Sequence, residues 1–175
     1  MQKSYNRSKA NLGKQLERLI DMTHHQYRNK GVADIRKVPT PVQITSNNRG
    51  KVTGYTQTGE WVDYVGAHNG KTIVFDAKET KLKSFPLENL QPHQYELLKS
   101  WREQGAAAFL IVQFTKLHEE IYLLPFKILQ EYWEDAEKGG RKSIPHSAFI
   151  ERCDLIKSEG GVTLHYLKNI RRCLV

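Results

Sequence analysis

Cysteine is scarce in this sequence, with Cys153 and Cys173 as its two examples among 175 residues. Neither belongs to a CxxC pair or to a Cys/His spacing, which argues against a structural zinc site. No run approaches the roughly 18 apolar residues that a membrane helix needs, and the N-terminus lacks the apolar core of a secretory signal. We therefore expect a cytoplasmic protein with no membrane partner and with both thiols reduced.

The motifs of several common enzyme classes are also missing. There is no Walker loop and no GxGxxG, so chemistry driven by a bound nucleotide is not indicated. The histidines show neither HxH nor HExxH spacing, which argues against a zinc hydrolase. No serine lies in a nucleophile-elbow pattern, so the acidic and basic side chains are left as the candidates for chemistry.

Positive charge is in excess: 27 Lys and Arg against 19 Asp and Glu give a net charge of +8. A pI near 9.5 points toward a polyanionic partner such as nucleic acid. From charge alone, a basic surface without such a partner is an equally good interpretation. Much of this charge is clustered, at 3–14, 49–51, 78–83 and 141–142. This clustering beside other conspicuous features favours nucleic acid.

Apolar periodicity and glycine or proline breaks divide the chain into short elements. Helices are expected at 11–29, 92–104, 125–136 and 146–151. Strands are expected at 32–44, 61–65, 71–78, 106–114, 121–124 and 162–167. Pro39 and Pro41 mark the first strand as bent or at an edge, and the turn at 66–70 predicts an antiparallel hairpin. The order predicts an α/β (α+β) fold with a mixed central β-sheet flanked by helices.

Two segments differ in composition from this core. Residues 1–10 are polar, basic and aperiodic, which is typical of a disordered tail. Residues 45–60 are polar and contain three glycines, and we expect them to form a protruding stalk, such as a hairpin. Residues 11–175 are expected to form a single domain that carries this stalk.

Acidic and basic side chains gather on the predicted hairpin. Asp63 lies before its turn, and Asp76 and Lys78 end the most apolar strand at a spacing of two, so both project from one face. Two neighbouring carboxylates repel unless a divalent cation lies between them, and the Ala77 carbonyl could be a third ligand. Lys78 could then position a water or stabilise charge on a phosphate. The alternative is a surface ion pair of little consequence.

This D-(x)n-(D/E)-x-K arrangement resembles the active site of the PD-(D/E)xK nuclease superfamily. The resemblance implies Mg²⁺ held by the acids for phosphodiester hydrolysis, with Mn²⁺ as a substitute. It also implies a restriction-endonuclease-like core of helix, strands, helix and strand, which the predicted order fits. The motif is loose, because it matches many unrelated chains.

A closer resemblance covers residues 11 to 145. The motifs KxPTPVQI (37–44), AKET…FPL…HQ (77–94) and GRKSIP (140–145) resemble those of the RecU family of Holliday junction resolvases, in the same order and at similar spacing. The resemblance implies a homodimer that binds four-way junction DNA and nicks it symmetrically with Mg²⁺. The stalk would enter the junction centre.

The resemblance also implies roles for individual residues. It maps the metal-binding acids onto Asp63 and Asp76, where the family often has Glu at the second position, and the catalytic lysine onto Lys78. Glu17 matches an acidic position on the first helix, with a solvated helix glutamate as an even alternative. Gln94 matches an accessory polar position, with simple helix-start chemistry as an even alternative.

One departure from the family pattern precedes the first acid. The family commonly carries hydroxyl residues there, whereas this chain has Trp61 and Val62, which cannot donate such hydrogen bonds. This leaves the support of the site and its rate in question, although Asp63 itself is present.

DNA contacts are expected from basic residues near the site and on the stalk, with one aromatic residue. The candidates are Arg49, Lys51, Tyr55, Lys81, Lys83, Arg141 and Lys142. Tyr55 could stack on an unpaired base, and a solvated loop tyrosine is an equal alternative.

Three functions from different classes therefore compete. The first is a metal-dependent junction endonuclease, which the motifs favour. The second is a junction-binding or strand-annealing protein that does not cut, and the third is a related nuclease that acts on DNA ends or flaps. A recombinase or a branch-migration helicase is a possible protein partner of the first.

Overall fold

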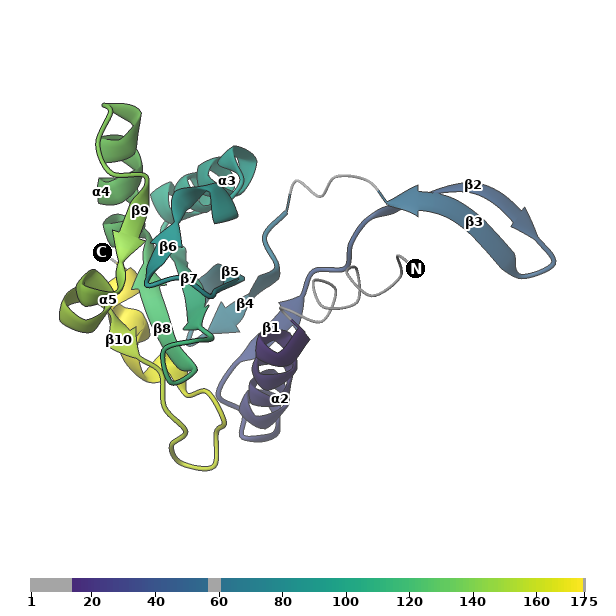
Figure 1. Cartoon of the computed structure of the whole chain (residues 1–175). Helices are drawn as coiled ribbons and strands as arrows, with labels where there is room; N and C mark the ends of the chain where they lie inside the picture. The colour runs from purple at the N-terminus through teal and green to yellow at the C-terminus, as the bar shows by residue number, and fades with distance from the viewer. Residues whose placement is uncertain (1–13, 57–60, 175) are drawn as a thin grey trace, which may run out of the picture.

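The structure is a computed structural model, and it describes residues 14–56 and 61–174. A six-stranded sheet with the order β1-β4-β5-β7-β8-β10 forms its centre (Figure 1). Its strands are β1 (Asp34–Lys37), β4 (Tyr64–His68), β5 (Lys71–Thr80), β7 (Ala107–Phe114), β8 (Glu120–Pro125) and β10 (Asp154–Leu155). Only β5 and β7 are parallel, because α3 (Pro92–Glu103) connects them as a crossover. The expected mixed sheet flanked by helices is confirmed.

Helices cover both faces of this sheet. The remaining helices are α2 (Lys14–Asn29), α4 (Phe126–Glu137) and α5 (His146–Arg152), with 3₁₀ turns η1 (Leu87–Asn89) and η2 (Tyr166–Cys173). Residues of α3, α4 and α5 share one buried cluster with Val74, Leu110 and Val112. Residues of α2 and η2 share the other cluster with Phe75 and Phe109. β5 and β7 therefore lie between two apolar cores, which explains their long apolar runs.

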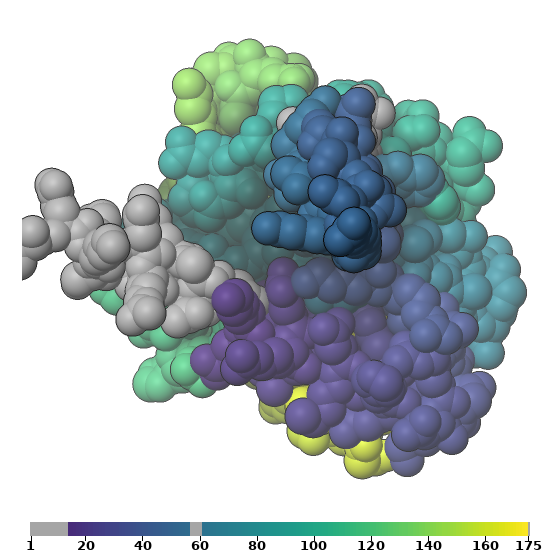
Figure 2. Space-filling view, turned by 90° about the vertical axis from the view of Figure 1, so that its right-hand side faces the viewer, coloured from purple at the N-terminus to yellow at the C-terminus, as the bar shows by residue number. Residues whose placement is uncertain are grey.

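The stalk is a two-stranded hairpin of β2 (Val42–Asn48) and β3 (Lys51–Thr56). It extends from the body in Figure 1 and lies in front of the body in Figure 2, and every residue of both strands is exposed. Arg49 and Gly50 form its turn, both at positive φ, as a tight hairpin turn requires. Pairing begins at Val42, so the stalk starts three residues earlier than expected. Residues 57–60 of the expected stalk, and the tail 1–10, lie outside the described residues.

Three predictions about strands are wrong. The strand expected at 61–65 is shifted to β4 (Tyr64–His68), so the first three residues of the expected turn at 66–70 are paired with β5 and the turn is Asn69–Gly70. The single strand expected at 32–44 is divided: β1 joins the central sheet, and β2 starts after Pro39 and Pro41, which cannot donate backbone hydrogen bonds. The strand expected at 162–167 is absent, and η2 occupies its end. Side chains of α2 bind this backbone instead, because the Thr23 hydroxyl accepts from Leu164 N–H at 3.0 Å.

A small two-stranded sheet, which the sequence did not predict, joins β6 (Ser84–Pro86) and β9 (Ser143–Pro145). These segments are far apart in the chain, and because they pair antiparallel, the loops that precede them lie at opposite ends of the short ladder. No helix among the described residues is both long and apolar enough to cross a membrane.

Candidate active site

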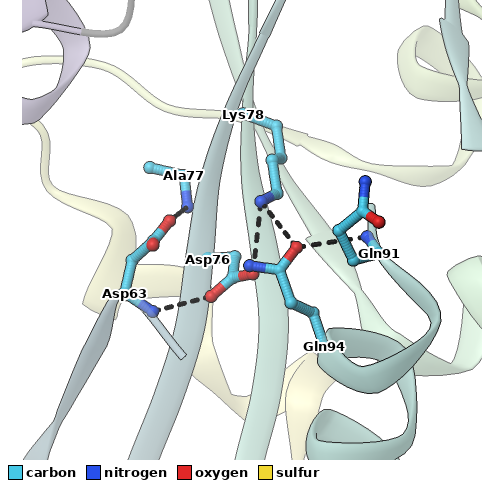
Figure 3. A network of polar contacts seen from close by, with 6 residues as sticks. All are labelled: Asp63, Asp76, Ala77, Lys78, Gln91 and Gln94. Carbon is cyan, nitrogen blue, oxygen red and sulfur yellow. Dashed lines mark hydrogen bonds and ion pairs between the residues drawn. The ribbon is translucent and has the colours of Figure 1, made fainter. Parts of the chain in front are cut away.

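Asp63 and Asp76 face each other at the point where β4 and β5 separate. Tyr64 pairs with Phe75, so Asp63, one residue before β4, lies opposite Asp76. The Asp63 N–H donates to Asp76 Oδ1 at 2.7 Å, and the Ala77 N–H donates to Asp63 Oδ2 at 3.0 Å (Figure 3). Beyond the last backbone pair of β4 and β5, carboxylate oxygens thus accept the hydrogen bonds that backbone carbonyls accept within the ladder. These hydrogen bonds fix the positions of both aspartate side chains.

Lys78 lies on the same side of β5 as Asp76. Its ammonium is 3.3 Å from Asp76 Oδ2 and donates to Gln94 Oε1 at 3.0 Å. The lysine side chain is 16% exposed, so its amine is directed toward the carboxylate and is still reachable from solvent. The predicted convergence of these side chains is therefore present in the structure.

Gln94 connects this lysine to the start of α3. Its Oε1 also accepts from Gln91 N–H at 3.2 Å, and the Gln91 side chain accepts from the Gln94 backbone. This reciprocal pair is a capping box, which satisfies free N–H groups at the helix start. The helix-start interpretation of Gln94 is therefore confirmed, and the same oxygen also contacts Lys78; an accessory role in the active site stays a prediction.

Asp76 is the most constrained charge of the site. It is 0% exposed, and burial raises its pKa above the usual range, as does the Asp63 charge, while Lys78 and the Asp63 N–H act in the opposite direction. Its Oδ2 receives no hydrogen bond of good geometry, and the Lys78 ammonium is its polar neighbour. Burying a carboxylate with an incompletely satisfied oxygen is unfavourable unless a cation compensates.

The donor set fits a hard divalent cation. Among the described residues no three His, Cys, Asp or Glu side chains converge on one point, so an ion here would take two carboxylates together with backbone and water oxygens. In a strand, the N–H and C=O of one residue face the same neighbour. Because the Ala77 N–H faces Asp63, the Ala77 carbonyl faces that side too.

Glu17 lies on α2 and does not contact the pair of aspartates. Its carboxylate pairs with Lys37 at 2.8 Å, and both side chains are largely exposed. Burial raises the pKa of Tyr64, and the charges of Asp21, Glu17 and Asp63 raise it further. Carboxylates of α2 therefore lie around the tyrosine that follows Asp63. The sequence analysis did not single out Asp21, although it lies one helical turn after Glu17.

The predicted stalk residues lie on the β2–β3 hairpin, which precedes Asp63 in the chain, and are all exposed. Arg49 occupies the hairpin turn, and Lys51 begins β3. The Tyr55 hydroxyl donates to Gln43 Oε1 at 2.7 Å, so its ring is held against β2 and is 54% exposed.

The other basic candidates flank the β6–β9 pair. Lys83 O accepts from His146 N–H at 3.2 Å, and Lys142 O accepts from Leu87 N–H at 3.1 Å. Lys81 and Arg141 are the exposed neighbours of these lysines. The loop between β5 and β6 is braced by Thr80, whose hydroxyl donates to Ser84 O at 3.1 Å. Two basic segments about 60 residues apart in the chain thus flank one short antiparallel ladder, one at each of its ends, which no local sequence signal predicts.

Comparisons with known proteins identify the family of the chain. The family model described as Recombination protein U, RecU, matches residues 11–172. The chain is 37% identical to the Holliday junction resolvase RecU of Pediococcus pentosaceus, over 93% of this chain and 84% of that protein. It is 36% identical to the protein of the same name from Oceanobacillus iheyensis, over 97% of this chain and 87% of that one.

Among solved structures, Hjc, a Holliday junction resolvase from Archaeoglobus fulgidus, aligns with 66% of this chain and 73% of its own. The TM-score is 0.40 at 15% identity, a likeness too low to establish a shared fold. The sequence matches cover nearly the whole chain at well over 30% identity and confirm the resemblance read from the motifs. The chain therefore belongs to the RecU family.

Proposed function

We propose that this protein resolves four-way DNA junctions by metal-dependent hydrolysis of phosphodiester bonds. The observation that carries the proposal is the convergence of Asp63, Asp76 and Lys78 at one end of β4 and β5. The names of the RecU relatives supply the substrate class, and the net charge of +8 suits a polyanion.

The two aspartates and the Ala77 carbonyl would hold Mg²⁺, with Mn²⁺ as a substitute. When bound, such an ion polarises a phosphate oxygen and lowers the pKa of a coordinated water. Asp63 and Asp76 are held by strand hydrogen bonds, so little reorganisation is needed when a phosphate arrives. Lys78 supplies a positive charge where the phosphate gains negative charge, and Gln94 orients its amine.

A homodimer would match the substrate. A four-way junction has two equivalent scissile strands related by a two-fold axis, and a C2 dimer carries two sites in the same relation. The exposed stalk, with Arg49 and Lys51, would contact phosphates at the junction centre. The Lys81–Lys83 and Arg141–Lys142 segments would hold an arm of the duplex near the site.

A junction-binding protein that does not cut is the second candidate. The observation that favours it is the lack of hydroxyl residues before Asp63: Val62 is buried and apolar, and Trp61 carries no hydroxyl. Synthetic mobile junctions incubated with the protein and Mg²⁺ or Mn²⁺ test the two. Paired symmetric nicks support the resolvase, and tight binding without nicks under either ion supports the second candidate. If the protein cuts flaps or DNA ends faster than junctions, it is a related nuclease that acts on a different DNA substrate.

A further inference from the structure

Trp61 is an exposed aromatic residue at the rim of the candidate site. Its side chain is 54% exposed, and it precedes Asp63 by two residues. Val62, between them, is 2% exposed and packs in the core on the α3 side of the sheet. A buried residue and a hydrogen-bonded aspartate therefore anchor the segment directly after Trp61.

The indole of Trp61 rests on α3. Its ring lies edge-on to Trp101, with 6.4 Å between centroids and 62° between planes. Trp101 follows Gln94 by seven residues, so both lie on one stripe of the helix. This stripe contacts Lys78 at its start and Trp61 further along. At 1.5 Å per residue the two contacts are about 10 Å apart along the helix axis.

That separation is comparable with the spacing of nucleotides. Bases along one DNA strand rise by about 3.4 Å, so the two contacts are separated along the helix axis by the length of roughly three base steps. An exposed aromatic ring beside a phosphate-cleaving site offers a flat apolar surface that matches the face of a base. Paired, stacked bases present no free face, whereas the branch point of a junction can.

We infer that Trp61 stacks on an unpaired base at the branch point and so positions the strand whose phosphate enters the site. The inference rests on the proposed junction-resolving function. Trp61 acts through the placement of the DNA and does not touch the reacting phosphate. It occupies a position where the family pattern leads one to expect a hydroxyl residue, so the ring supplies a contact of a different kind.

The test uses a synthetic junction with 2-aminopurine at the branch point, whose fluorescence falls when the base stacks on an aromatic ring. Asp76→Asn serves as the background, so that the DNA stays intact during binding. In the Asp76→Asn background, the further change Trp61→Phe should keep the quenching, and the junction affinity should stay within about 3-fold of that of Asp76→Asn alone. Trp61→Leu and Trp61→Ala should lose the quenching and bind about 10-fold more weakly, equivalent to ~1.4 kcal/mol.

Leucine separates stacking from simple apolar packing against Trp101. If Trp61→Leu keeps both the quenching and the affinity, the inference is overturned. It is also overturned if the Asp76→Asn protein, with Trp61 intact, shows no quenching when it binds the junction. A Trp61→Ala protein that loses its dimer mass in light scattering, with normal quenching, would assign the ring to a protein interface instead. Ile150→Ala, which removes another exposed apolar side chain, should behave as the background does. Nicking by the wild-type protein is measured separately. Failure to nick junctions would contradict the proposed function, whereas the quenching measurement decides only whether Trp61 stacks on the base.

Discussion

Asp63 and Asp76 are joined by a hydrogen bond of 2.7 Å that runs from the backbone of one to the side chain of the other. In return, the Asp63 carboxylate accepts from Ala77 N–H, directly after Asp76. Two carboxylates that would repel in solution are thus held together by the same hydrogen bonds that end the β4–β5 ladder. The proposed cation would relieve this unfavourable charge pair, so we expect the protein's stability to depend on divalent metal.

Divalent metal should therefore stabilise the folded protein. At a Mg²⁺ concentration 100 times the dissociation constant, we expect about 2.7 kcal/mol of added stability. Thermal melts with and without MgCl₂, in a buffer of constant ionic strength, measure this change. Asp76→Asn should remove most of the effect, because the amide is a weaker ligand. A melting temperature that responds equally in wild type and variant would argue against a metal site at Asp76.

Gln94 should matter to catalysis beyond its part in the helix cap. Gln94→Leu removes both the cap bond and the contact to Lys78, whereas Gln91→Leu removes only a cap bond. Each variant should lose about 1 kcal/mol of unfolding free energy. Gln94→Leu should in addition nick about 10-fold more slowly, because the amine of Lys78 loses its orientation. Urea unfolding and single-turnover nicking separate the two effects, and equal nicking rates in the two variants would leave Gln94 with a structural role alone.

The stalk should determine the preference for junctions and leave the body unaffected. Replacing 47–52 by Asn-Gly shortens the hairpin while keeping a two-residue turn. All the removed residues are exposed, so the melting temperature should stay nearly constant. Competition binding between a junction and a linear duplex should show at least a 10-fold loss of junction preference. Retained preference would place junction recognition on the body.

His24 should make the fold sensitive to acid. Its ring is buried, and Nε2 lies 2.8 Å from the Tyr166 hydroxyl. Burial, helped by the charges of Arg28 and His25, lowers its pKa to about 3. The folded-state pKa is below the unfolded value of about 6.5, so stability is complete above pH 6.5 and declines as the pH falls.

At pH 5 this decline is about 2 kcal/mol relative to pH 7.5. His24→Phe keeps an aromatic ring at the site but cannot take up a proton. Its unfolding free energy in urea should therefore fall by about 2 kcal/mol less than that of the wild type between these pH values. Equal losses in the two proteins would show that His24 is not the group that titrates.

The sequence predicted those features that depend on local patterns. The apolar runs at Ala107–Phe114 and in the middle of β5 indicate buried strands, and the two-residue spacing of Asp76 and Lys78 places both on one face. Asp63 was predicted to join them because a short turn fixes the register of β4 against β5. The helices were found from their periodicity and their proline or glycine limits.

Features that depend on distant contacts were missed. Val162, Leu164 and Tyr166 alternate as in a strand, yet their segment packs against α2, where Thr23 and Tyr27 bind its backbone. The β6–β9 pair joins Ser84–Pro86 to Ser143–Pro145, about 60 residues later in the chain, and no local pattern predicts it. The pairing of Glu17 with Lys37 likewise depends on how α2 lies against β1.

Nicking of a synthetic mobile junction tests the central claim most directly. Wild-type protein with Mg²⁺ should cut two opposite strands at symmetric positions, and EDTA should abolish the cutting. Asp76→Asn and Lys78→Gln should bind the junction with nearly unchanged affinity and nick it at least 100-fold more slowly, since the first removes a proposed metal ligand and the second the positive charge beside the phosphate. Normal nicking by Asp76→Asn, or nicking by the wild type that persists in EDTA, would contradict the account.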